Sequence, residues 1–339
     1  MEKNYFVNVV NGNLITDLIL YNKDKDDFNC QKDKNSYSWI LIDLILTRDC
    51  NFRCRYCALN FEKKFMSIKV LLYLVRLVIK QLVKYFKFVD IEFFGWEPLL
   101  NYEIIYKTIK ILKWFENIRY KLVTNWSLLN KEILEFLFKN KVEVVFSVST
   151  NNLFMFKNNK YIDILKMLAS YPYTMINFII EPKEFKKLDF LADNLIKYWF
   201  KRISFIPVVY TMSRDTESVE SAKRLRLKLE NNKWLKLYYM RNTDHKELFS
   251  KEEIEIVIDY NWDIYFDNEV ELYLLKDLVP NNVFNYGELK MWNVKTLLDL
   301  DKLRTGYNHF LKKRTYYFKS IVNYLKWWEN FMFIKEIFN

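Results

Sequence analysis

The sequence contains very little glycine and no long uncharged apolar run. Only 4 of its 339 residues are glycine, where average usage of roughly 7% would give about 24. No uncharged apolar span of about 18 residues occurs, so we expect no membrane-spanning helix. The N-terminus lacks the apolar core and cleavage site of a secretory signal, which predicts a cytoplasmic protein. Four cysteines in a chain of this length exclude a disulfide scaffold.

The residues that are abundant indicate a folded, basic protein. Apolar residues make up 51% of the chain and charged residues 28%, which excludes disordered and low-complexity classes. The 53 Lys and Arg against 42 Asp and Glu give a net charge of +11, which permits acidic partners. Aromatic residues make up 18% but lie mostly at core spacing, so we do not expect a nucleic-acid partner.

Strand-like and helix-like segments alternate through the middle of the chain. Six β–α repeats of this kind imply a parallel sheet with right-handed crossovers. Periodicity alone leaves open a partial barrel, a full barrel and an open doubly wound sheet. Strands are expected at 39–46, 88–94, 120–124, 142–148, 174–180 and 203–209, and helices at 66–86, 102–115, 131–139 (capped by Asn130), 160–169 and 183–198.

Two flanking regions are predicted around a core at 39–210. Residues 1–38 form a small appendage, in which strands at 5–10 and 13–21 flank the turn signal Asn11-Gly12. Residues 211–339 form an α+β extension. It is expected to contain a basic helix at 215–237, strands at 254–259 and 264–266, and a terminal helix at 309–338. The charges of the basic helix are interpreted as a solvated face.

Three of the four cysteines follow the first core strand. Cys50, Cys54 and Cys57 have the spacing C-x3-C-x2-C, and thiolates suit both zinc and iron–sulfur clusters. Structural zinc normally takes a fourth Cys or His, and neither Cys30 nor the two histidines makes a second paired knuckle. Three ligands suit a [4Fe–4S] cluster with one open iron. A zinc loop or a chance grouping of cysteines is the alternative.

This motif and its place after the first strand resemble the radical S-adenosylmethionine (radical SAM) enzymes. The resemblance, over roughly residues 39–210, implies a partial (β/α)6 TIM-like barrel. It implies one [4Fe–4S] cluster held by Cys50, Cys54 and Cys57, with S-adenosylmethionine as the second cofactor. Reductive cleavage would give a 5′-deoxyadenosyl radical that abstracts hydrogen from the substrate. A low-potential electron donor such as flavodoxin or ferredoxin is expected.

Further segments match the family at the ends of later strands. Gly95-Trp96-Glu97-Pro98 resembles the family's Gly-Gly-Glu-Pro, which holds the cofactor's amino group, and Thr124-Asn125-Trp126 resembles Thr-Asn-Gly. The resemblance places the following residues at the cofactor: Tyr56 on the adenine, Gly95, Trp96, Glu97 and Pro98 at the amino group, Thr124, Asn125, Ser147 and Ser149 in the pocket, and Ile206 (with Pro207) near the adenine. Taken singly, each serine or Thr124 is equally a turn or cap residue.

The C-terminal part resembles the peptide-modifying SPASM/twitch branch of the family. Residues 259–265 and 286–289 resemble its hairpin and Gly-Asn-Leu segment, and the opening hairpin is also similar. That branch normally adds cysteines for auxiliary clusters, whereas this chain has none after Cys57. We therefore expect a peptide or protein substrate, with a precursor peptide as one candidate, and no auxiliary cluster. The alternatives are a small-molecule substrate and a degenerate, non-catalytic metal-binding homologue. Cys30 is a candidate hydrogen donor, although an ordinary loop cysteine explains it equally.

Tryptophan stands where the family and helix geometry favour glycine. Trp96 and Trp126 replace glycines of the two motifs, Trp262 lies in the C-terminal hairpin, and Trp199 follows a helix. Such positions need positive φ or close backbone approach. Together with the shortage of glycine, this gives the hypothesis that some of these codons are UGA read as glycine in the source organism. The alternative is genuine tryptophan in a divergent or inactive homologue.

Overall fold

The computed structural model describes residues 37–57, 61–181, 184–208, 216–239, 253–258, 263–266 and 290–293. The N-terminal hairpin, Cys30, Trp262 and the terminal helix therefore lie outside the described residues, and these predictions stay predictions. So do the domain boundaries after residues 38 and 210. In the described part of the chain, no helix combines the length and the apolarity that crossing a bilayer requires.

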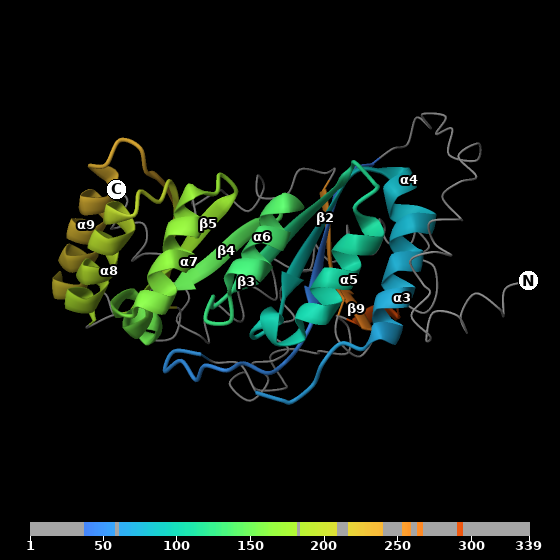
Figure 1. The fold of residues 1–339 in the computed structure, drawn as a ribbon, viewed down its shortest axis with the longest axis horizontal. Coiled ribbons are helices and arrows are strands. Elements are labelled where there is room, and N and C mark those ends of the chain that lie inside the picture. Colours follow the sequence, from blue (N-terminus) through green and yellow to red (C-terminus); the bar gives the residue numbers. More distant parts are fainter. Residues whose placement is uncertain are drawn as a thin grey trace, which may run out of the picture.

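The described strands form one open sheet (Figure 1). Its order is β10-β9-β8-β1-β2-β3-β4-β5-β6-β7. Strands β10 and β7 end this order without pairing with each other, so the barrel is partial, as the resemblance predicted. The strands are β1 (Tyr37–Ile45), β2 (Phe86–Phe94), β3 (Ile118–Thr124), β4 (Glu143–Val148), β5 (Thr174–Ile180), β6 (Arg202–Pro207), β7 (Lys236–Tyr239), β8 (Glu253–Ile258), β9 (Asp263–Phe266) and β10 (Lys290–Asn293).

Parallel pairing extends from β8 through β1 to β7, and only β9 and β10 run antiparallel to their neighbours. Strands β1 to β6 confirm the six predicted β–α repeats. The hairpin of β8 and β9 confirms the two strands expected near 254–259 and 264–266.

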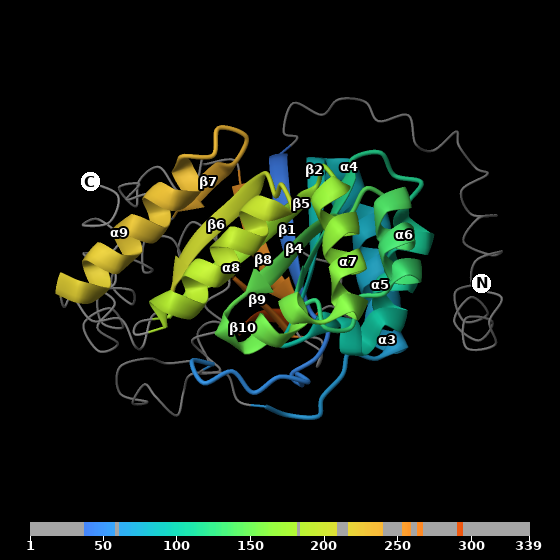
Figure 2. The same ribbon diagram turned by 60° about the vertical axis from the view of Figure 1, so that its left-hand side comes forward.

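Helices connect the parallel strands and lie along one face of the sheet (Figure 2). They are α3 (Ile68–Leu77), a π-helical turn (Val78–Leu82), α4 (Val83–Tyr85), α5 (Tyr102–Leu112), α6 (Lys131–Lys139), α7 (Asn159–Ser170), α8 (Phe185–Lys197) and α9 (Thr216–Glu230), with 3₁₀ segments η3 (Pro98–Asn101) and η4 (Thr150–Lys157). Helix α6 has the predicted bounds, and the Asn130 side chain caps it by accepting from the Ile133 N–H at 2.8 Å.

Alternation along the strands explains why the core lies between sheet and helices. On β3, Ile118, Tyr120 and Leu122 are buried, while the residues between them are partly or fully exposed. Strand β5 repeats this pattern with Ile176 and Phe178 fully buried. Side chains two residues apart share a face, so the buried series packs under the helices and the other series faces the opposite side.

Two expectations about elements were wrong in detail, and one strand pairing was not predicted. The helix expected at 66–86 is broken by the π-helical turn, and β2 already begins at Phe86. The basic helix ends at Glu230, and Lys236–Tyr239 forms β7 on the edge of β6. Strand β8 pairs with β1, which lies more than 200 residues earlier in the chain. A local pattern carries no information about such distant pairing.

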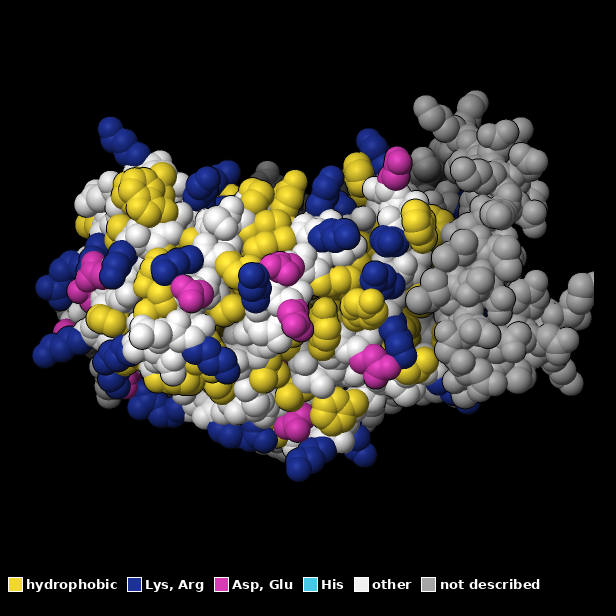
Figure 3. Space-filling model, in the orientation of Figure 1, with side chains coloured by type: hydrophobic (Ala, Val, Ile, Leu, Met, Phe, Trp, Pro, Cys, Tyr) yellow, Lys and Arg dark blue, Asp and Glu magenta, His cyan; other side chains and the backbone are white. Residues whose placement is uncertain are grey.

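Charges are spread over the helical face rather than gathered. Figure 3 shows Lys and Arg side chains scattered across it with Asp and Glu between them. Within α9, Lys228 pairs with Asp189 and Asp193 of α8, each at 2.7 Å. Part of this basic helix therefore packs against its neighbour instead of presenting its whole charge to solvent.

Candidate functional site

The candidate site lies where the parallel strands end. Carboxyl ends of parallel strands meet at one edge of a sheet, so segments distant in sequence come together there. The residues are Thr47 to Cys57 after β1, Gly95 to Pro98 after β2, Asn125 to Ser127 after β3, Ser149 and Thr150 after β4, and Glu181 after β5.

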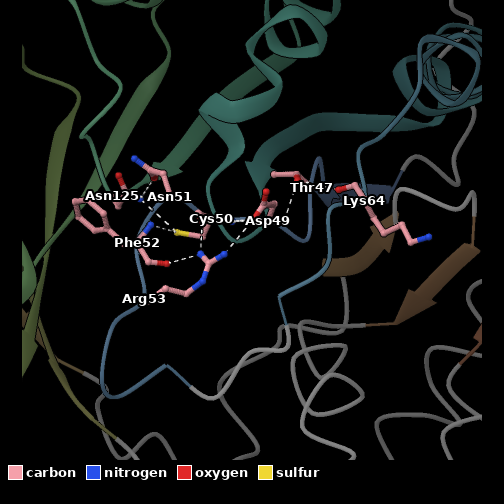
Figure 4. A network of polar contacts seen from close by, with 8 residues as sticks. All are labelled: Thr47, Asp49, Cys50, Asn51, Phe52, Arg53, Lys64 and Asn125. Carbon is pink, nitrogen blue, oxygen red and sulfur yellow. Dashed lines mark hydrogen bonds and ion pairs between the residues drawn. The ribbon is translucent and has the colours of Figure 1, made fainter.

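A hydrogen-bond network fixes the start of the cysteine loop (Figure 4). The Thr47 hydroxyl donates to the Lys64 carbonyl at 2.8 Å and accepts from the Asp49 N–H at 3.0 Å. The Asp49 carboxylate accepts from the Cys50 N–H at 2.8 Å and pairs with Arg53 at 3.4 Å. Sequence reasoning missed these supporting residues, although Asp49 is adjacent to the first cysteine.

The sulfur of Cys50 is held by two donors. The Phe52 N–H lies 3.3 Å from Cys50 Sγ, and the Asn125 side-chain amide lies 3.5 Å from it. The same amide donates to the Asn51 side chain at 2.9 Å. Burial raises the pKa of the Cys50 thiol, and the two donors, which favour the thiolate, partly offset this rise. Hydrogen bonds to ligand sulfurs also tune the potential of a bound cluster.

Cys54 lies in a buried environment with Tyr56 and Ser149. Burial raises the pKa of the Cys54 thiol to about 11, against a hydrogen bond from Tyr56 that lowers it. Burial also raises the pKa of Tyr56, whose hydroxyl is hydrogen-bonded to Ser149 and Cys54. A thiol binds metal as the thiolate, so metal binding here displaces a proton. The structure thus brings Tyr56 and Ser149 together with a cysteine of the motif.

The loop is also tied to the end of β5. The guanidinium of Arg55 lies 3.0 Å from the Glu184 carboxylate and 3.8 Å from that of Glu181. Glu181 is buried and accepts from both the N–H and the hydroxyl of Thr150, at 3.0 and 2.6 Å. This connection between three strand ends was not predicted from the sequence, because nothing local pairs Arg55 with residues about 130 positions later.

The three thiols fit a cluster better than a single ion. Cys50, Cys54 and Cys57 are half-buried, and none forms a disulfide with another described residue. The charges of Cys50 and Cys57 both raise the pKa of Cys54, so the three lie near one another. Yet within the described ranges no three Cys, His, Asp or Glu side chains are placed to hold one metal ion. In a cluster each cysteine ligates its own iron, so the thiolates surround a face rather than a point.

Glu97 is fully buried and joins the ends of β2 and β3. Its carboxylate accepts from the Thr124 hydroxyl at 2.7 Å, the Asn125 N–H at 2.7 Å and the Leu99 N–H at 3.1 Å. Burial raises the pKa of Glu97 to about 7, while these hydrogen bonds act to lower it. The predicted Glu97, Thr124 and Asn125 therefore come together, and the carboxylate already has protein partners.

Gly95 is required by close backbone approach. Its φ is +126°, and a Cβ there would lie 2.6 Å from the Thr47 carbonyl oxygen. The next two N–H groups bind the cysteine loop: Trp96 donates to the Thr47 carbonyl at 3.2 Å, and Glu97 donates to the Asp49 carbonyl at 3.1 Å. Pro98 is buried and begins η3. The segment after β2 thus fixes the loop that carries Cys50.

Two of the four singled-out tryptophans have the backbone that favours glycine. Trp126 has φ +57° and Trp199 has φ +62°, and Lys141 is the remaining described non-glycine residue with positive φ. Trp96 is not in this group, and it is largely buried. Trp126 is fully buried beside Phe146, with centroids 5.6 Å apart, and its indole N–H has no hydrogen-bond partner among the described residues.

The remaining predicted residues, Ser149, Ser147 and Ile206, lie after β4, within β4 and within β6. Ser149 caps η4 by accepting from the Asn151 N–H at 3.2 Å, in addition to its contact with Tyr56. Ser147 lies on the partly accessible side of β4. Ile206 lies on the same side of the sheet, in β6, in register with Ile179.

Comparison with known proteins finds a family model that matches part of the chain. Residues 44–178 match the sequence model of the Radical SAM superfamily. Over these residues, about two fifths of the chain, the sequence is similar to radical SAM domains. Proteins of this superfamily use a [4Fe–4S] cluster and S-adenosylmethionine.

Two curated relatives are distant and longer than the matched part. The chain is 24% identical over 301 residues to the radical SAM cyclopropyl synthase TigE of Paramaledivibacter caminithermalis, which covers 83% of this chain and 51% of the relative. It is 31% identical over 176 residues to protein MJ0907 of Methanocaldococcus jannaschii, covering 48% of this chain and 60% of the relative. The chain thus spans between half and three fifths of these relatives.

Solved structures share the fold at low identity. anSMEcpe with bound AdoMet and Cp18Cys peptide has a TM-score of 0.59 at 15% identity, covering 81% of this chain and 83% of that one. Streptococcus suis SuiB bound to precursor peptide SuiA has a TM-score of 0.55 at 18% identity, covering 79% and 65%. These likenesses confirm the partial barrel.

Proposed function

We propose that this chain is a radical SAM enzyme in which Cys50, Cys54 and Cys57 hold one [4Fe–4S] cluster with an iron open to S-adenosylmethionine. The observation that carries this proposal is that three half-buried cysteines of one loop lie together at the carboxyl edge of the sheet. When bound and reduced by one electron, these cofactors supply cleavage of the sulfonium and removal of a hydrogen atom from a substrate.

The protein's own residues position and shield this chemistry. The backbone of Gly95 and Trp96, with Glu97 behind it, is proposed to face the cofactor's ammonium, because Glu97 joins two strand ends and supplies negative charge. Tyr56 is held beside Cys54 by the contacts described above. Pocket walls are assigned to Pro98, Thr124, Asn125, Ser147, Ser149 and Ile206.

The proposed substrate is a peptide or protein, and the proposed branch is the SPASM/twitch type. Support comes from the relatives: TigE is a radical SAM cyclopropyl synthase, and anSMEcpe and SuiB were solved with peptides. The β8–β9 hairpin, which lies where the sequence resembles that branch, adds to this support. The electron is proposed to come from flavodoxin or ferredoxin.

Anaerobic reconstitution with iron and sulfide tests the proposal. The reduced protein should convert S-adenosylmethionine to 5′-deoxyadenosine, detected by liquid chromatography. Cys54→Ala is expected to lose both cluster and product, because each cysteine ligates one iron. Co-expression with a short precursor peptide encoded beside the gene, followed by mass spectrometry, tests the substrate class. If the protein carried a full complement of cluster but formed no 5′-deoxyadenosine, the proposed enzymatic activity would be contradicted.

A non-catalytic homologue is the second candidate, and one observation favours it. Trp126 fills the turn directly after the Thr124 and Asn125 pair that binds Glu97. A bulky indole at a glycine position of the motif can displace the pocket wall. This alternative would be favoured if the protein bound zinc stoichiometrically. It would also be favoured if the spectrum of a bound cluster did not change when S-adenosylmethionine was added.

A further inference from the structure

The amino edge of the sheet carries exposed aromatic rings and exposed lysines. At this edge each helix leads into the next strand, so it lies opposite the cysteine loop and forms the upper edge in Figure 1. Five connections follow one another along it, because they enter β3, β4, β5, β6 and β7, which are neighbours in that order. We call the residues of these connections, 112–118, 139–143, 170–174, 197–202 and 230–236, the amino-edge surface.

Three large aromatic side chains of the amino-edge surface are exposed. Trp114, Tyr173 and Trp234 have 60%, 46% and 38% of their surface exposed. They lie on the connections that enter β3, β5 and β7, so they are spread along the edge. Trp199, stacked on Trp234, adds a fourth ring if its codon specifies tryptophan. A single exposed ring is ordinary, whereas several rings along one edge, beside unpaired cations, indicate a contact surface.

Exposed lysines lie on the same connections, and their ammonium groups have no ion pairs within the part of the chain that the structure describes. They are Lys113, Lys139, Lys141, Lys197, Lys201, Lys233 and Lys236. The acids there are Glu116, Glu143 and Glu230, and the last two are already paired, with Arg202 and Arg226. Figure 3 shows dark-blue and yellow side chains next to one another along this upper edge. The described amino-edge surface is therefore strongly positive.

Helix geometry explains only part of this pattern. A cation near a helix C-terminus is favoured by the helix dipole, which accounts for Lys139 at the end of α6 and Lys197 at the end of α8. The dipole does not account for Lys236, which begins a strand, or for the exposed rings of Trp114 and Tyr173. These features together suit an anionic partner that also accepts aromatic rings.

The spacing and the type of these residues select among anionic partners. Rings two strands apart are separated by about 10 Å, whereas successive bases of a nucleic acid lie about 3.4 Å apart, so the rings cannot stack on neighbouring bases. Protein interfaces favour arginine and are depleted in lysine, and fixing a lysine costs side-chain entropy. The headgroup layer of an anionic bilayer suits both residue types, because Trp and Tyr settle at headgroup depth and lysines are attracted without fixed partners.

We propose that the amino-edge surface binds the headgroup layer of an anionic phospholipid bilayer. The rings of Trp114, Tyr173 and Trp234 enter the headgroups, and the lysines of the same connections supply the electrostatic attraction. The cysteine loop lies at the opposite edge of the sheet, so a bilayer bound here leaves that edge open to substrate. This inference goes beyond the proposed function and does not depend on it.

The test is sedimentation of the full-length protein with vesicles. Wild-type protein should sediment with vesicles of phosphatidylglycerol and phosphatidylcholine in equal parts, less so as salt rises, and should not sediment with phosphatidylcholine alone. In the triple variant Lys139→Gln/Lys201→Gln/Lys233→Gln, each lost lysine should weaken the partition coefficient about fivefold, which gives about 100-fold together. Trp114→Ser should weaken it about tenfold, because most of this ring is available for burial among the headgroups.

A second triple variant is the matched control. Lys107→Gln/Lys131→Gln/Lys166→Gln removes the same net charge from the helical face, where these lysines pair with Glu103, Glu135 and Asp163. Exposed pairs of this kind contribute little to stability, so the control should fold. Because screening limits the reach of these charges, its partition coefficient should stay within about twofold of the wild-type value.

Several outcomes would overturn the inference. Equal weakening in the two triple variants would mean that net charge alone attracts the vesicles. Failure of the wild type to bind either kind of vesicle, or equal binding to both kinds, would remove the anionic bilayer as the partner. Tighter binding of a single-stranded oligonucleotide, lost in the amino-edge triple variant, would assign the surface to nucleic acid instead. If circular dichroism showed that the amino-edge triple variant had not folded, Trp114→Ser would decide, and wild-type partitioning of that variant would overturn the inference.

Discussion

Replacement of Trp199 by glycine tests whether this position was built for glycine. Trp199 follows α8 with φ +62°. Its N–H donates to the Ile196 carbonyl at 2.9 Å, and the Phe200 N–H donates to the Leu195 carbonyl at 3.2 Å. This pair of bonds defines a Schellman motif, in which glycine is preferred at the left-handed residue.

The structure gives the size of the expected effect. Left-handed backbone costs a residue with a Cβ roughly 1–2 kcal/mol. The indole is 62% exposed and stacks on Trp234 with centroids 4.4 Å apart, a contact worth about 0.5–1.5 kcal/mol. Trp199→Gly loses the ring stacking on Trp234 but also removes the strain of the left-handed backbone. Its free energy of unfolding should therefore stay within about 1 kcal/mol of that of the wild type. Trp199→Ala loses the stack and keeps the strain.

The decisive comparison is therefore Trp199→Gly against Trp199→Ala in urea unfolding. After allowance for the greater freedom of glycine in the unfolded chain, the glycine variant should be more stable by about 1 kcal/mol. At Lys113, an exposed helix end with φ −59°, the order should reverse, with alanine more stable. If alanine at position 199 equals or exceeds glycine, the left-handed assignment is refuted. Codons reading UGG at positions 96, 126, 199 and 262 would end the recoding hypothesis itself.

Three further predictions concern the site. Gly95→Ala should lower the free energy of unfolding by at least about 2 kcal/mol, because φ is +126° and the new Cβ meets the Thr47 carbonyl; a change under about 0.5 kcal/mol would contradict this. Glu97→Gln should remove a pH dependence: with the pKa raised from 4.5 to about 7, wild-type stability falls by about 3 kcal/mol as pH rises through that interval. If the urea midpoints of the wild type and of Glu97→Gln shifted equally between pH 4.5 and 7, this prediction would be contradicted. Cys54→Ala should abolish iron binding while Cys30→Ala keeps it, and iron loss in the second variant would overturn the ligand assignment.

The sequence was sufficient for elements whose signals are local. Strand β5 and helix α6 have the predicted bounds, because alternation and the Asn130 cap are contained in their own residues. Strand β7 was missed, and the place of β8 in the sheet was not predicted, because the positions of these strands depend on parallel pairing with β6 and β1.

The candidate site shows the same division. The glycine-like positions predicted left-handed backbone at Trp126 and Trp199, whereas the metal chemistry expected from the cysteine spacing stays a prediction. The carboxylate of Glu97 bonded to Thr124, 27 residues away, could not be predicted, and neither could the Arg55–Glu184 pair across 129 residues. Such contacts follow from which strand ends meet, which only the fold determines.

Electron paramagnetic resonance of the reconstituted, reduced protein, with and without S-adenosylmethionine, tests the central claim most directly. The account predicts about four iron atoms per chain and a cluster signal that changes when S-adenosylmethionine binds the open iron. A signal that stays unchanged, or a protein that holds zinc and no iron, would contradict it.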